Sequence, residues 1–121
     1  MSTEKKCSEI VNGIPITRHY DWYNKKTIID SELLTDLPEQ VQEAVLDWIR
    51  RNVFPRKTLN KRHTSYGIKH CLQRDLGIYT TNNQFKHAML LCGYIPENEP
   101  ELNWTYRISE KSPCFRTEVC L

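Results

Sequence analysis

The fold is decided between residues 64 and 93, which read TSYGIKHCLQRDLGIYTTNNQFKHAMLLCG. Apolar residues recur in this stretch at spacings of three and four positions, which is the period of a helix with one buried face. The first part predicts a helix from about Ser65 to Leu76. Thr64 or Ser65 supplies a hydroxyl that can cap the free amides, and Gly77 suits the left-handed conformation that ends many helices.

The second part of the same stretch predicts another helix after a short connector, residues 78–80. Thr81 and Gln84 lie three positions apart, as in a capping box, and therefore mark the start of this helix. Gly93 marks its end. The apolar face consists of Phe85, Ala88, Met89 and Cys92.

A further helix is predicted before this pair, from Pro38 to about Val53. Asp36 is placed to cap it, and Pro55 prevents it from continuing. Its apolar residues share one stripe: Val41, Ala44, Val45, Trp48 and Ile49. We expect Trp48, Ile49, Leu72, Phe85 and Met89 to form the shared core of the three helices.

The remaining segments of the C-terminal two-thirds are a loop and a strand. Arg56 to His63 is polar, basic and without period, which indicates a loop. Trp104 to Ser109 alternates apolar and polar residues, which predicts a half-buried strand. The order is helix, basic loop, helix, tight connector, helix, loop and strand. It predicts an α+β fold: a small, mainly helical winged-helix or helix-turn-helix domain with a few short strands.

The first 36 residues are predicted to form an N-terminal extension of the same compact unit. Residues 1–13 are polar and without period, so we expect a loose lead-in. β-Branched and aromatic residues become frequent from Ile14 to Ile29, and a turn at Lys25-Lys26 would divide them into a small hairpin or edge strands. The extension therefore spans 1–36 and the winged-helix-like domain 37–121.

Positive charge is concentrated in the middle of the chain. The net charge is only +2, but residues 50–74 contain eight Lys or Arg and no acid. The flanking segments are acidic, at −4 for residues 1–49 and −2 for residues 75–121. A basic run of this kind is typical of a surface that meets phosphates. Solvated charges on a loop and two helix edges would give the same pattern.

On the nucleic-acid interpretation, the last helix enters the major groove and the strand serves as a wing. Asn and Gln can bond adenine edges, and lysine can reach guanine or phosphate, so we expect the polar residues of this helix to point outward. The basic loop would contact the backbone. The predicted binding residues are Arg50, Arg51, Arg56, Lys57, Lys61, Arg62, Lys69, Asn82, Asn83, Lys86 and His87. The alternative is a three-helix core whose polar faces meet only water or another protein.

No enzymatic function is expected. The sequence lacks a glycine-rich phosphate loop, a G-x-S-x-G elbow and an H-E-x-x-H pair. Its four histidines and five cysteines show no zinc-type spacing, so no catalytic residue, metal or cofactor is predicted. The cysteines, odd in number and without a Cys-x-x-Cys pair, fit a reducing compartment, with Cys71 and Cys92 in the core. No apolar run is long enough to span a membrane and no export signal is visible, so we expect a cytoplasmic protein.

The central stretch resembles a group of short accessory proteins from phages and integrative elements of Gram-positive bacteria. The resemblance rests on residues 56–58, 63–70 and 77–89. The cadence Ser-Tyr-x-Leu-Lys followed by Tyr-x-x-Asn-x-x-Phe-x-x-Ala-Met is also similar to the winged-helix tails of phage-type primase-helicases. It covers about residues 45–110 and implies a winged helix in a bacterial host cell, but no catalytic residues. Such proteins include transcriptional regulators, replication accessories and anti-CRISPR inhibitors.

Two functional hypotheses follow. The first is a winged-helix protein that binds nucleic acid, most simply duplex DNA of the element itself. The second is an inhibitor of a host defence nuclease, of the anti-CRISPR type, that binds the guide RNA or the protein of a ribonucleoprotein. The acidic first third, with Tyr20, Trp22 and Tyr23, supports the second hypothesis because aromatic residues beside charges are common interface anchors. The target and the oligomeric state do not follow from the sequence.

Overall fold

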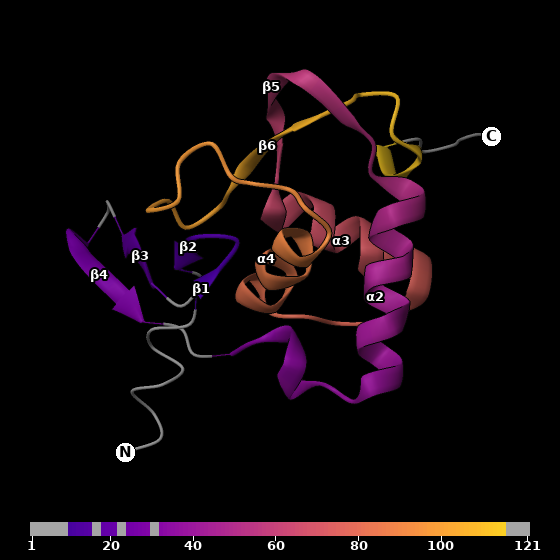
Figure 1. Cartoon of the computed structure of the whole chain (residues 1–121), viewed down its shortest axis with the longest axis horizontal. Coiled ribbons are helices and arrows are strands. Elements are labelled where there is room, and N and C mark those ends of the chain that lie inside the picture. The colour runs from indigo at the N-terminus through magenta and orange to yellow at the C-terminus, as the bar shows by residue number, and fades with distance from the viewer. Residues whose placement is uncertain (1–9, 16–17, 22–23, 30–31, 116–121) are drawn as a thin grey trace.

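A computed structural model describes residues 10–15, 18–21, 24–29 and 32–115 (Figure 1). Within these residues the chain forms a small α+β fold in which the strands pair two by two and are always antiparallel. The elements in chain order are β1 (Ile10–Val11), β2 (Ile14–Pro15), β3 (Arg18–Asp21), β4 (Lys26–Ile29), η1 (Leu34–Asp36), α2 (Glu39–Asn52), β5 (Pro55–Thr64), α3 (Ser65–Leu76), α4 (Asn82–Leu91), β6 (Thr105–Ile108) and η2 (Pro113–Phe115).

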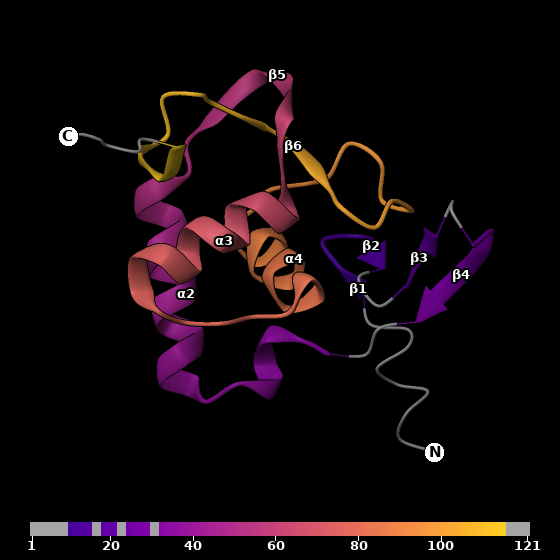
Figure 2. The same cartoon turned by 180° about the vertical axis from the view of Figure 1, so that it is seen from behind.

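Helix α4 lies in the middle of the fold, with α2 along one side and α3 behind it (Figures 1 and 2). The expected shared core is confirmed, because all five predicted residues are buried. The η1 turn and strand β6 also contribute to it. The largest buried side chains of this core are Trp104, Tyr106, Phe85, Leu34, Ile49, Ile68, Leu72, Met89, Leu90 and Ile108.

The helix ends follow the local signals for α3 and α4. The Thr64 hydroxyl accepts from the amide of Gly67, and Gly77 has a φ of 69° at the end of α3. Thr81 and Gln84 form the predicted capping box, with bonds of 3.1 and 3.0 Å between each side chain and the other residue's amide. Both helices therefore begin where the sequence predicts, and Thr105–Ile108 confirms the expected strand.

The predicted cap of α2 is wrong, although the helix itself is confirmed. Pro38 occupies the N-cap position and supplies no side-chain cap. Asp36 instead accepts a bond of 3.0 Å from the amide of Leu33 and so stabilises the η1 turn. Leu33 and Leu34 are buried in the core. The proposed division at residue 36 stays a prediction, but the segment just before it packs with the helices.

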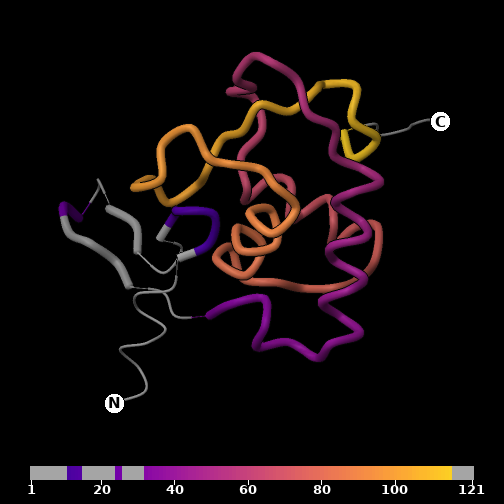
Figure 3. The backbone as a smooth tube through the Cα atoms, in the orientation of Figure 1, coloured from indigo at the N-terminus to yellow at the C-terminus, as the bar shows by residue number. Residues whose placement is uncertain are grey.

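The basic segment expected to be a loop is a strand. β5 runs from Pro55 to Thr64 and pairs with β6, and the ribbon projects beyond the helices (Figure 3). The register joins Pro55 to Ile108, Asn60 to Tyr106 and Thr64 to Thr105, with two irregularities between these pairs. The sequence shows no period of two because most of the strand is exposed and its register shifts break the alternation.

The N-terminal part forms two small strand pairs, β1–β2 and β3–β4. The β3–β4 pair is the expected hairpin, but its turn lies at Asn24-Lys25 and not at Lys25-Lys26. The first pair docks on the helices, because the Asn12 side chain donates to the carbonyl of Leu90 at 2.6 Å and Val11 packs against the core. Residues 10–13 are therefore not a loose lead-in. Residues 1–9 lie outside the described part, as do Trp22 and Tyr23.

None of the helices in the described part of the chain is long and apolar enough to cross a membrane.

Candidate nucleic-acid interface

Strand β5 carries four exposed basic residues: Arg56, Lys57, Lys61 and Arg62. Among the described residues, no carboxylate forms an ion pair with any of them. Arg56 uses part of its guanidinium locally, since Nε and Nη2 donate to the carbonyls of Thr58 and Leu59 at 3.0 Å each. The structure therefore places together, on one projecting strand, the side chains that the sequence assigned to phosphate contact.

Asn60 holds the irregular middle of this strand. Its Nδ2 donates to the carbonyl of Ile108 at 3.2 Å and to the carboxylate of Glu110 at 2.8 Å. Its Oδ1 accepts from the amide of Arg62 at 2.8 Å. The buried Asn60 side chain thus pairs two backbone groups, the Ile108 carbonyl and the Arg62 amide, at the irregular part of the ladder.

Glu110 is the acid nearest to this bend. The bond from Asn60, and a second contact from His63 Nε2 at 3.1 Å, hold the pKa of its carboxyl below the ordinary value. The His63 ring in turn stacks on Phe115, with 3.6 Å between ring centroids. This cluster joins the end of β5 to the segment after β6, so it fixes the position of the ribbon on the fold.

The other basic residues of the run differ in their availability. Arg51 pairs with Asp47 at 3.0 Å. Arg74 pairs with Asp75 at 2.9 Å and also donates to the carbonyl of Cys114. Arg50 is exposed at the end of α2, which leads directly into the ribbon. Within residues 50–74, the exposed cations without an ion pair to a described acid are thus Arg50, Arg56, Lys57, Lys61 and Arg62.

The outward orientation expected for the polar residues of α4 is wrong. Asn83, Lys86 and His87 are only 1, 1 and 3% exposed, and every side chain from Asn83 to Leu90 is buried. Asn82 is half-buried and donates to the carbonyl of Leu102 at 3.0 Å. In this fold these side chains cannot reach the edges of bases in a groove.

These polar side chains instead bind the segments that cover α4. Asn83 Nδ2 donates to the carbonyl of Glu32 at 2.7 Å. Lys86 Nζ donates to the carbonyl of Leu102 at 3.0 Å and lies 4.3 Å from the centroid of the Trp104 ring. Hydrogen bonds of this kind make the burial of polar groups tolerable. The polar face of α4 is therefore a docking face for its own chain.

One signal in the sequence could have indicated this burial. From Asn82 to Leu91 the helix contains one lysine and no acid, whereas α2 contains five charged residues in its 14 positions. A helix exposed on one face to water or to DNA usually carries more charge. The amide side chains at the start of α4 suit a surface that contacts bases, but amides serve equally well as partners for buried backbone groups.

Lys69 is also placed differently from the expected phosphate contact. It is 4% exposed, and its Nζ lies 4.6 Å from the ring centroid of Tyr79 and 5.3 Å from that of Tyr66. Burial lowers the pKa of its ammonium group. The two tyrosines, which the charge pattern did not identify, are 49% (Tyr66) and 62% (Tyr79) exposed.

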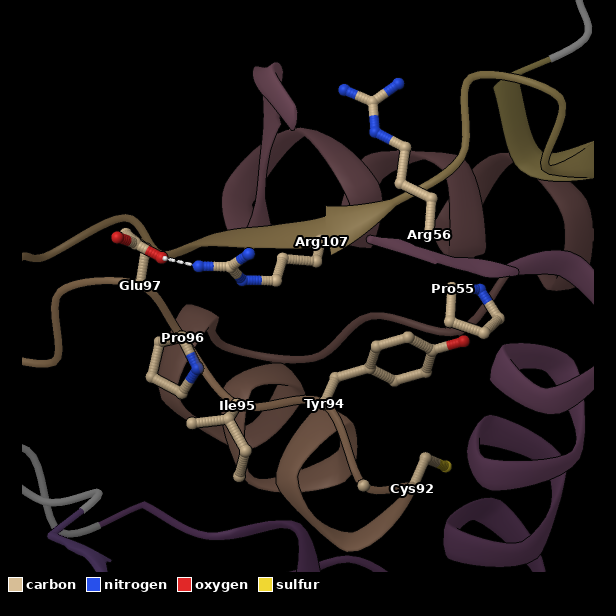
Figure 4. A pocket seen from close by; sticks show the side chains of 9 residues that line it. Pro55, Arg56, Cys92, Tyr94, Ile95, Pro96, Glu97 and Arg107 are labelled. Carbon is tan, nitrogen blue, oxygen red and sulfur yellow. Dashed lines mark hydrogen bonds and ion pairs between the residues drawn. The ribbon is translucent and has the colours of Figure 1, made fainter. Parts of the chain in front are cut away.

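A pocket of about 570 Å³ lies beside the ribbon. Arg107 on β6 extends along it, donating to the carbonyl of Lys57 at 2.8 Å and to Glu97 at 3.3 Å, while the Arg56 guanidinium points away from Glu97 (Figure 4). Arg107 lies outside the basic run, so charge counting missed it, although it adds a cation to the same ribbon. The pocket is lined by Pro55, Arg56, Cys92, Gly93, Tyr94, Ile95, Pro96, Glu97 and Arg107.

Comparisons of the chain with protein-family models, with curated proteins and with solved structures find no match. Among the described residues, no group of three or more His, Cys, Asp or Glu side chains is placed to hold a metal ion.

Proposed function

We propose that this protein binds nucleic acid through the β5–β6 ribbon of a winged-helix-like domain, in the cytoplasm of a bacterium that carries a phage or a mobile element. The observation that carries the proposal is the set of four exposed basic side chains on β5, none of which forms an ion pair with a described residue. The order helix, strand, helix, helix, strand in α2, β5, α3, α4 and β6 supports a winged-helix-like arrangement, in which we assign the β5–β6 ribbon the role of a wing.

The arrangement of the cations suits a ribbon that lies between two phosphate backbones. The exposed pairs Arg56-Lys57 and Lys61-Arg62 lie on the two sides of Asn60, so the cations are spread along the length of the ribbon. A two-stranded ribbon fits the major groove of B-DNA. Because phosphate contacts carry little sequence information, we expect affinity without strong base preference.

A salt titration tests this proposal. For a random 20-base-pair duplex, each phosphate contact contributes about −0.9 to the slope of log affinity against log salt concentration. Replacing Arg56, Lys57, Lys61 and Arg62 together by alanine should flatten the slope by about 3.6 units if each side chain contacts one phosphate. Lys25→Asn is the matched control, since it removes an exposed lysine from the separate β3–β4 turn. An unchanged slope in the quadruple variant would remove the ribbon from the proposal.

A second candidate function is inhibition of a host RNA-guided nuclease. It is favoured by the burial of α4, which leaves the winged-helix arrangement without its usual base-reading helix while the basic ribbon stays exposed. The cations of such a ribbon would contact the phosphates of a structured guide RNA as well as those of DNA. In a purified cleavage assay, the wild type should slow cleavage by the ribonucleoprotein, and the quadruple variant should not. If a saturating concentration of the wild-type protein left cleavage unchanged, inhibition of the nuclease in that assay would be excluded.

A further inference from the structure

Lys69 is only 4% exposed as a residue, and its ammonium group reaches solvent between two tyrosine rings. No hydrogen bond or ion pair joins its Nζ to another described residue, and its contacts are with the faces of the Tyr66 and Tyr79 rings. A ring face attracts a cation but does not replace the hydrogen-bond acceptors that water or an anion provides. Burial accordingly destabilises the charged form, which lowers the pKa of Lys69. An anion bound from outside would pair with the ammonium group in place of water.

The two rings that shelter this ammonium group are themselves open to solvent. Tyr79 lies on the connector between α3 and α4 and is the most exposed large apolar side chain described. Tyr66 lies in the first turn of α3 and is half exposed. Exposed aromatic rings beside a positive charge are the usual platforms on which unpaired bases stack.

The cluster also lies where a strand leaving the ribbon would arrive. β5 ends at Thr64 and α3 begins at the next residue, so Lys61 and Arg62 come just before Tyr66 in the chain. Figure 2 shows α3 and the connector on the near side of the molecule, with β5 entering α3 from above. The first turn of α3 is open, because a Cβ on Gly67 would meet no atom within 4 Å. Its N-terminal amides add positive potential there.

We propose that Tyr66, Lys69 and Tyr79 bind a phosphate and the adjoining unpaired base of a single-stranded nucleic-acid segment. Lys69 binds the phosphate, and a tyrosine ring stacks on the base. This inference rests on the proposed function, and it names the substrate class: a duplex with a single-stranded extension, held by the ribbon on the duplex and by this cluster on the extension.

The test compares three probes by fluorescence anisotropy: a blunt duplex, the same duplex with a six-nucleotide tail, and the same tail built from abasic nucleotides. The wild type should bind the tailed duplex about tenfold more tightly than the blunt one. The abasic tail should give only part of this gain, because it keeps the phosphates and loses the bases. An RNA tail on the same duplex distinguishes RNA from DNA as the preferred extension.

Variants test whether the tighter binding of the tailed duplex depends on the cluster of Tyr66, Lys69 and Tyr79. Tyr79→Ala and Lys69→Met should lose the tail-dependent gain and keep the affinity for blunt duplex, whereas Tyr79→Phe should keep both because the ring remains. Tyr79 is exposed, so its substitution leaves the fold intact even if Lys69→Met does not. Equal affinity of the wild type for blunt and tailed probes overturns this inference and leaves the proposed function standing. An abasic tail that gives the full gain overturns the stacking role. No binding to any probe at low salt overturns both proposals.

Discussion

The imidazole of His87 accepts a hydrogen bond at Nδ1 from the backbone amide of Leu34, 3.1 Å away and 53 positions earlier in the chain. Both residues are buried. The bond ties the centre of α4 to the η1 turn, so a side chain that the sequence assigned to base recognition instead satisfies a backbone donor of its own fold. A buried amide without such a partner would be strongly unfavourable.

The first prediction follows from this bond. His87→Ala should lower the free energy of unfolding by about 2–4 kcal/mol, because it leaves the Leu34 amide unpaired and opens a cavity. His70→Ala, at an exposed position of α3, should lower it by less than about 1 kcal/mol. Urea denaturation of both variants provides the comparison. If His87→Ala were as stable as the wild type but bound DNA less well, α4 would be a binding helix after all.

The helix ends and the core residues of α3 and α4 depend on residues that are close in the chain, and these features could be predicted from the sequence. The capping box of Thr81 and Gln84 and the stop at Gly77 depend on residues within one helical turn, so the bounds of α3 and α4 could be predicted. The apolar stripes identified Trp48 and Phe85 as core residues for the same reason.

The wrong predictions concern contacts that are distant in the chain. β5 is a strand because it pairs with β6, some 45 residues later, and Asn60 and Glu110 support its bend. Asn83 and Lys86 are buried because the segment before α2 and the loop before β6 cover α4. A helical period assigns side chains to faces, but it does not say which faces other parts of the chain will cover. Of the predicted interface residues, the cations on β5 are exposed as expected, whereas Asn83, Lys86 and His87 of α4 are buried.

The second prediction concerns the acid dependence of the ribbon. The folded-state pKa of Glu110 is below its ordinary value of 4.5, mainly because Asn60 donates to it. The stabilisation is therefore complete above that value and is lost as the pH falls through the lowered pKa. Between pH 5 and pH 3 the wild type should lose more stability than Glu110→Gln. The difference should be under about 1 kcal/mol, because the side chain is one-third exposed. If urea titrations showed the same loss in free energy of unfolding for both proteins, the lowered pKa of Glu110 would be wrong.

The third prediction compares two tyrosines, the fully buried Tyr106 and the partly buried Tyr94. The Tyr106 hydroxyl has no hydrogen-bond partner among the described residues, and burial raises its pKa well above the ordinary value. The Tyr94 hydroxyl donates to the carbonyl of Val53 at 2.7 Å. Tyr106→Phe should leave the free energy of unfolding unchanged or raise it by about 1 kcal/mol, because it removes an unpaired polar group. Tyr94→Phe should lower it by about 1 kcal/mol. Thermal unfolding of the two variants in parallel would show similar losses of stability if the Tyr106 hydroxyl had a partner.

The last prediction concerns sequence preference. A good base contact is worth about 1–3 kcal/mol of discrimination, enough to enrich a motif from a random pool of duplexes. Asn83, Lys86 and His87 are buried and bonded to their own chain, so these contacts are not available from α4. The ribbon cations, in contrast, neutralise phosphates of any sequence. Selection with the wild-type protein should therefore return a pool without an enriched motif, and the quadruple ribbon variant should retain little DNA at low salt. The double variant Asn83→Ala/Lys86→Ala should bind like the wild type wherever it remains folded, as judged by its circular dichroism. An enriched motif that this variant loses while folded would show that α4 opens to read DNA.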